Sequence, residues 1–175
     1  MMQQSTKKLM GEWGRVVAVA FVVFALAGVV WGFWQPVTTG AVTEDLAAVT
    51  GLSGETAAVP GFGGYVLATG LLGAVLAGWM FSVARRLRGP ASLVVAGVLA
   101  YLGSWIFLIF GNWVAEHFRA TDLTGVLTAG QQVTLVHQVA PGVGTLVAPA
   151  VALLVYWACA LFATDRMFEQ ETAAG

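Results

Sequence analysis

The densest group of side chains that could do chemistry lies around the end of the third long apolar stretch and in the segment after it. Its members are Asn112, Glu116, His117, Arg119, Asp122 and His137. Two imidazoles and a carboxylate are enough for a zinc site with three protein ligands and one open position. However, Glu116 and His117 are adjacent, so in a helix their side chains project about 100° apart, and no His-x-x-x-His pair is present.

We therefore interpret this group as a polar cap in which Glu116 and Arg119 pair at i, i+3, and we assign no catalytic, metal-binding or cofactor-binding residue. A site formed by Glu116, His117 and His137 stays the alternative. Other signatures of enzymes are missing from the sequence: it has no Gly-x-Ser-x-Gly elbow, no P-loop and no dinucleotide fingerprint. The sequence thus predicts a protein that is not an enzyme and carries no cofactor.

Composition limits where such a chain can reside. Of its 175 residues, 58% are hydrophobic and only 10% are charged, whereas soluble domains carry about 25% charged residues. A net charge of −1 argues against a nucleic-acid-binding protein, because such proteins need a clustered basic surface. A single cysteine excludes an internal disulfide. We expect an integral membrane protein.

Four stretches are long and apolar enough to cross a bilayer as helices, since a span needs about 20 residues. They run over residues 16–34, 64–83, 91–114 and 143–163, and none contains a charged residue. The first is longer than the apolar core of a secretory signal and ends in aromatic residues, so we interpret it as an uncleaved anchor. The predicted fold class is an all-α membrane protein with four transmembrane helices.

The basic residues predict the orientation, because Lys and Arg in short flanking segments stay cytoplasmic. Every basic residue except Arg119 lies in one of three segments: the N-terminus (residues 1–15), the turn (residues 84–90) and the C-terminal tail (residues 164–175). We therefore expect both termini in the cytoplasm, in the inner (plasma) membrane. The turn contains Arg85, Arg86 and Arg88, which could contact anionic lipid headgroups.

Two longer segments, residues 35–63 and 115–142, then lie outside and are expected to pack as a small extracytoplasmic cap. In the first, Thr43 to Gly51 resembles a short helix with Thr43 as its N-cap. In the second, the alternation over Gln132 to Val139 favours a strand, with a helix as the alternative. The low charge of both segments suggests a surface that meets lipid headgroups or another protein.

Small residues predict how the helices meet, because they permit close backbone approach in lipid. Residues 64–83 contain Gly70, Gly73 and other small residues at four-residue spacing, and residues 91–114 contain a similar series. Since the turn between these two spans is short, we expect their small faces to contact each other. In the last span, Pro149 cannot donate to the carbonyl of Thr145, which predicts a kink.

The pattern resembles a family of uncharacterised four-span membrane proteins of actinobacteria. The matching features are a first span ending in Trp31-Gly32-Phe33-Trp34-Gln35-Pro36 and a glycine-rich second span that runs into Arg85-Arg86-Leu87-Arg88-Gly89-Pro90. The resemblance covers roughly residues 15–114 and implies a small accessory subunit in the inner membrane. It brings no catalytic residues.

These observations together favour a non-catalytic accessory or assembly subunit of a larger respiratory or cell-envelope membrane complex, with other membrane proteins as partners. The low-charge cap supports this role. The spans lack ionisable groups, which argues against coupled transport, because transport of that kind usually needs such groups within the bilayer. A small transporter or channel component is the alternative, supported by Pro149 and the glycine-rich second span.

Overall fold

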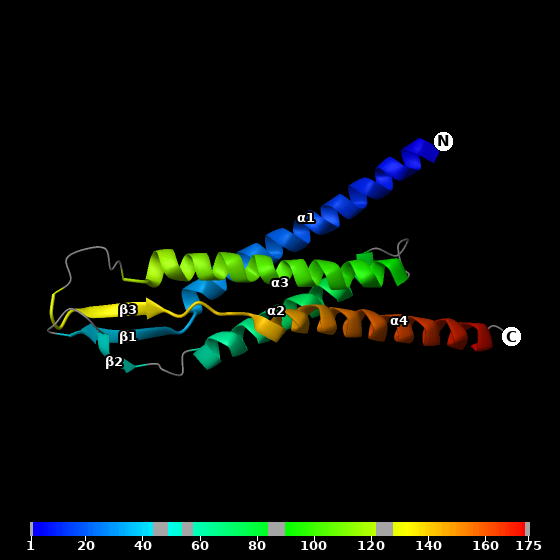
Figure 1. Cartoon of the computed structure of the whole chain (residues 1–175). Coiled ribbons are helices and arrows are strands. Elements are labelled where there is room, and N and C mark those ends of the chain that lie inside the picture. The colour runs from blue at the N-terminus through cyan, green and yellow to red at the C-terminus, as the bar shows by residue number, and fades with distance from the viewer. Residues whose placement is uncertain (1, 44–48, 54–57, 84–89, 122–127, 174–175) are drawn as a thin grey trace.

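A computed structural model of the chain describes residues 2–43, 49–53, 58–83, 90–121 and 128–173. Within these residues it has four long helices, α1 (Met2–Trp34), α2 (Ala58–Val83), α3 (Pro90–Arg119) and α4 (Val147–Ala173) (Figure 1). Their candidate membrane spans are Trp13–Trp34, Val59–Val83, Pro90–Arg119 and Gly142–Ala163. The prediction of a mostly helical chain with four helices long and apolar enough to cross a membrane is confirmed.

Large and small apolar residues are distributed in the opposite way to a water-soluble bundle. Large side chains point outward, such as Leu26 at 61% exposed, Leu67 at 76% and Leu154 at 65%. The fully buried positions include many small residues: Ala77, Ala96, Ala100, Ala148 and Ala152. This arrangement suits a bundle surrounded by hydrocarbon, because close packing of small residues holds helices together where burial of apolar surface gives no advantage.

The helices associate mainly as two pairs, α1 with α3 and α2 with α4, and α3 also packs against α4. In the first pair, Gly28 lies against the backbone of Phe107, and Gly32 lies against Gly111. A side chain at Gly28 would collide with that backbone, which explains the glycine.

The second pair corrects the expectation that the small faces of residues 64–83 and 91–114 meet. Gly70 of α2 instead faces Val147, and an added Cβ at Gly73 would lie 2.5 Å from the carbonyl oxygen of Ala148. Both of these partners belong to α4. α2 also contacts α3, as where Tyr65 packs on Phe107, but these two glycines direct its close backbone approach toward α4.

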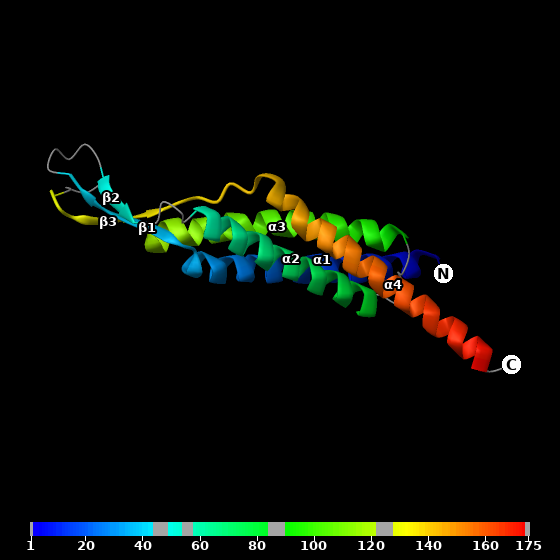
Figure 2. The same ribbon diagram turned by 90° about the horizontal axis from the view of Figure 1, so that it is seen from below.

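A three-stranded antiparallel sheet lies beyond the helix ends, with strand order β2-β1-β3 (Figures 1 and 2). Its strands are β1 (Val37–Val42), β2 (Val49–Ser53) and β3 (Gln132–Val136). β1 and β3 pair in regular register from Val37 opposite Val136 to Ala41 opposite Gln132, whereas the pairing of β1 with β2 is interrupted by a bulge between Thr39 and Ala41. The two connecting segments therefore pack together as expected.

Two predictions need correction here. The fold is not purely α-helical, because the cap is built on this sheet. The expected helix over Thr43 to Gly51 is wrong for Val49 to Gly51, which belong to β2; residues 44–48 lie outside the described residues. The predicted strand from Gln132 is confirmed, but it ends at Val136 and not at Val139.

The last span begins as a 3-10 helix, η2 (Gly142–Leu146), and changes to α-helix at Val147. Pro149 is thus in the first turn of α4, where a backbone N–H has no partner in the regular α-helical pattern. The kink expected at Pro149 stays a prediction.

The sheet occupies one end of the molecule, and the N-terminus and the C-terminus both lie at the other (Figure 1). We call these the sheet end and the terminus end. The end of α2 and the start of α3 lie toward the terminus end as well (Figure 1). Arg85, Arg86 and Arg88 lie outside the described residues.

Candidate functional site

The junction between the helices and the sheet centres on Gln35, the residue directly after α1, which is only 1% exposed. The guanidinium of Arg119, at the end of α3, donates a hydrogen bond to the backbone carbonyl of Gln35. The side-chain amide of Gln35 donates to the carbonyl oxygen of His137 at 3.0 Å. One residue therefore joins the ends of α1 and α3 to the chain that leaves β3.

A small polar pocket of about 160 Å³ opens beside this junction, between the end of α3 and β3. Glu116 lines it and accepts a hydrogen bond from the side-chain amide of Gln138 at 3.3 Å. Thr121 closes the neighbouring edge of β3: its hydroxyl accepts from the backbone N–H of Thr134 at 2.8 Å, and its own N–H donates to the Thr134 carbonyl at 3.0 Å. The pocket thus offers one carboxylate in neutral surroundings.

Glu116 and Arg119, expected to pair with each other, bind different partners: Gln138 and Gln35. Both residues belong to α3, but Arg119 is the last residue of this helix. Its side chain extends to the end of α1. The polar cap predicted from the sequence is therefore present, with other partners. Its carboxylate is exposed, while its guanidinium links two helices.

The two histidines have different environments. His117 stacks on Trp113 with ring centroids 4.7 Å apart, and its Nδ1 lies 3.0 Å from the Trp113 carbonyl oxygen. Because a carbonyl can only accept, Nδ1 is the donor in this contact. His137 is exposed, and the contact described above uses its backbone carbonyl, not its ring.

Among the residues that the structure describes, no group of three His, Cys, Asp or Glu side chains is close enough to hold a metal ion. Asp122, a member of the sequence cluster, lies outside them. The structure therefore gives the alternative site of Glu116, His117 and His137 no geometric support.

Inside the bundle, polar groups pair at a few points that the sequence did not indicate. The hydroxyls of Ser92 on α3 and Tyr156 on α4 lie 2.6 Å apart and are buried. Ser104 donates to the Tyr101 carbonyl of its own helix at 2.7 Å, and the buried hydroxyl of Tyr65 has no hydrogen-bond partner among the described residues. In hydrocarbon a bond such as Ser92–Tyr156 holds two helices in register, since an unpaired hydroxyl has no water to bind.

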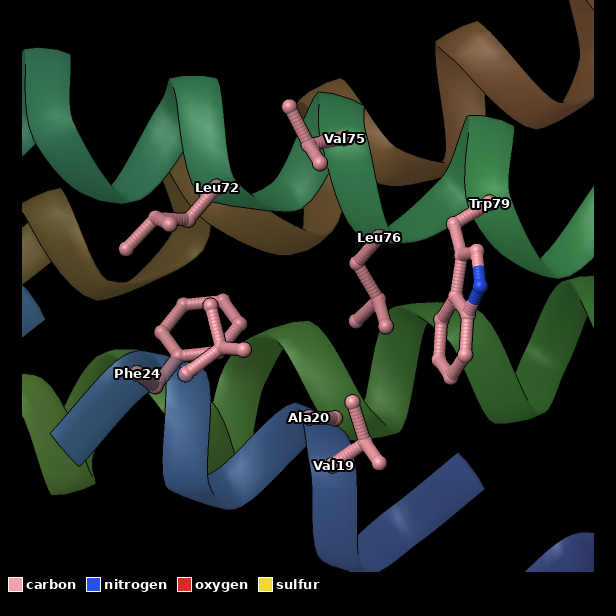
Figure 3. Close-up of a pocket in the computed structure, with 8 residues that line it drawn as sticks. Val19, Ala20, Phe24, Leu72, Val75, Leu76 and Trp79 are labelled. Atoms are coloured by element: carbon pink, nitrogen blue, oxygen red, sulfur yellow. The ribbon is translucent and has the colours of Figure 1, made fainter. Parts of the chain in front are cut away.

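A second hollow lies between α1 and α2, which hardly contact each other. It is an apolar groove of about 190 Å³ whose walls come from both helices (Figure 3). α1 contributes Val19, Ala20, Val23 and Phe24, and α2 contributes Leu72, Val75, Leu76 and Trp79. No catalytic chemistry is available there, because almost all of the lining surface is hydrocarbon.

Sequence reasoning found Glu116 and Arg119 but missed Gln35 and the groove. A signal for Gln35 existed: it is an amide placed between an apolar run and Pro36, where a helix must end. The groove had no such signal, because it depends on which helices pair. Searches against protein-family models, against curated proteins and against solved structures found no match to this chain.

Proposed function

We propose that this protein is a non-catalytic accessory or assembly subunit that binds other proteins of a larger membrane complex, of the respiratory chain or the cell envelope, in the inner (plasma) membrane. The observation that carries the proposal is the uncharged sheet that projects beyond the helix ends. The resemblance to the actinobacterial four-span family agrees with this role and stays a prediction.

The strands of the sheet contain no Asp, Glu, Lys or Arg. A surface exposed only to water normally carries many charges, whereas the centre of a protein–protein interface is depleted of them. Val133 and Val42 are buried within the cap, at 0% and 4% exposure, so the sheet is a packed unit and not an open apolar patch. Its threonine-rich strands suit contact with another protein through neutral hydrogen bonds.

The sheet is also firmly attached to the helices. Gln35 holds the chain entering β1 against α3 and against the chain leaving β3, and Thr121 holds β3 against the segment that follows α3. A surface held in one conformation loses less entropy when a partner binds. The carboxylate of Glu116 lines the small pocket at this junction. It offers a binding place for a basic side chain of that partner.

The test is whether a charge on the sheet releases the protein from its complex. Gln132 begins β3 and is exposed, so Gln132→Lys adds a charge to the sheet without disturbing the packed side. Ala140→Lys adds the same charge at an exposed residue of the chain that leaves the sheet. After gentle detergent extraction, native electrophoresis should show a heavy complex for the unaltered protein and for Ala140→Lys, and a much lighter species for Gln132→Lys.

A heavy complex that persists in Gln132→Lys would contradict the sheet as the binding surface. A small homo-oligomer in the unaltered protein would contradict the accessory role and support the transporter or channel alternative. The sequence features that suggested that alternative have structural uses: Gly70 and Gly73 pack on α4, and Pro149 lies in the first turn of a helix.

A further inference from the structure

The groove between α1 and α2 lies in the half of the bundle nearer the terminus end. Its lining residues on α2, from Leu72 to Trp79, belong to that half of the span Val59–Val83, and those on α1 begin at Val19, in the first half of the span Trp13–Trp34. α1 packs against α3, and its residues Ala20 and Phe24 are 3% and 1% exposed. α2 packs against α4. The lining side chains of the two helices face each other across this groove (Figure 3).

The size of the groove limits what can occupy it. A helix about 10 Å wide, running over the roughly 10 Å that this groove covers, would displace roughly 800 Å³. The groove holds about 190 Å³, far too little for a helix of a partner. It is somewhat larger than the roughly 150 Å³ apolar cavities that accept a benzene molecule. An apolar hollow of this volume suits a hydrocarbon chain.

Charge and polarity appear only where the groove ends. Arg15 precedes Val19 by four residues on α1, so it lies on the same helix face about 6 Å farther toward the terminus end, and it is exposed. On α2, the groove ends at Trp79, whose indole has an apolar body and one N–H, a side chain typical of the headgroup level. The mouth of the groove thus combines a guanidinium with an amphipathic ring.

We propose that this groove binds one acyl chain of an anionic phospholipid, whose phosphate is held by Arg15 at the mouth. A planar guanidinium binds phosphate through two parallel hydrogen bonds. An uncompensated negative headgroup is favoured over a zwitterionic one because its charge is not balanced by a neighbouring cation. The proposal does not depend on the accessory role, since the sheet lies at the opposite end of the molecule.

The experiment is native mass spectrometry of the full chain, released from nanodiscs that contain equal amounts of phosphatidylglycerol and phosphatidylcholine with the same acyl chains. One basic side chain near an anionic surface favours anionic lipid by about fivefold, so retained phosphatidylglycerol should exceed phosphatidylcholine by about that factor. Arg15→Gln should lower this ratio severalfold, and Arg15→Lys should keep most of it.

A matched pair of variants tests the groove itself. Val23 lines the groove and is 44% exposed, whereas Val22 is 56% exposed and does not line it. Val23→Trp should lower the retention of both lipids severalfold, and Val22→Trp should leave it unchanged. Equal lipid ratios for the unaltered protein and Arg15→Gln would overturn the role of Arg15. Equal retention by the two tryptophan variants, or a second copy of the chain bound in place of lipid, would overturn the groove as a lipid site.

Discussion

The contact of α1 with α3 at Gly28 gives the sharpest test of the fold. A Cβ added at Gly28 would lie 2.9 Å from the Cα of Phe107 and would overlap its carbonyl oxygen. Favourable carbon contacts occur at about 3.5–4.0 Å, so the two helices would have to separate by roughly 0.6–1 Å. Because the obstacle is backbone, it cannot turn away as a flexible side chain would.

Gly28→Ala is therefore expected to destabilise the protein by about 1–3 kcal/mol, the usual cost of overpacking. For a chain of this size about 2–4 °C corresponds to each kcal/mol, so the midpoint of thermal unfolding in detergent should fall by roughly 2–12 °C. Tryptophan fluorescence would report it, since Trp31 packs on Phe107 with ring centroids 5.4 Å apart.

Gly14→Ala is the matched control on the same helix, because a Cβ there would have no neighbour within 4 Å. Its midpoint should stay the same or rise slightly, since alanine favours helix over glycine. If the two variants behaved alike, the close approach of α1 to α3 would be wrong.

Two further predictions concern polar contacts. Removing either hydroxyl of the Ser92–Tyr156 pair, which are 2.6 Å apart, by Ser92→Ala or Tyr156→Phe should lower the unfolding free energy by about 0.6–1.7 kcal/mol; a double-mutant cycle without coupling would show that the pair does not form. Arg119→Met keeps an unbranched apolar stem but removes the hydrogen bond of Arg119 to the Gln35 carbonyl, and should speed amide hydrogen exchange in β1. Met10→Leu, a substitution at the other end of the molecule, should not alter that exchange, and an unchanged rate in Arg119→Met would contradict the junction.

The membrane spans were predictable because they depend only on length and hydropathy, properties of each segment alone. The pairing of the helices was not, since small residues at four-residue spacing occur on more than one span. Gly73 fits the backbone of Ala148, and nothing local distinguishes that partner from α3. Contacts between segments determine which helices pair, and the spacing of small residues within one helix does not specify those contacts.

In the connecting segments, too, local patterns were predictable from the sequence and contacts between distant segments were not. The strand at Gln132 was predicted from its alternation, while Thr43-Glu44-Asp45 had the local pattern of a helix start. In the structure, Val49 instead pairs with Val42. β1 is the central strand of the sheet, so it offers β2 an edge with which to pair. At the candidate site, Glu116 and Arg119 were recognisable as polar residues near a helix end. The bond from Arg119 to Gln35 spans 84 residues of sequence and requires the ends of α1 and α3 to coincide in space.

The sheet and the groove follow from the same arrangement of the helices. β1 continues from α1 and pairs with β3, which precedes α4, so the sheet connects a member of each helix pair at the sheet end. The contact of Gln35 with His137 adds a second connection there. In the other half of the spans, the described residues provide little contact between α1 and α2. The two pairs are also joined in that half by α3 and α4, where Ser92 hydrogen-bonds to Tyr156, so the apolar groove opens only on the side where α1 faces α2.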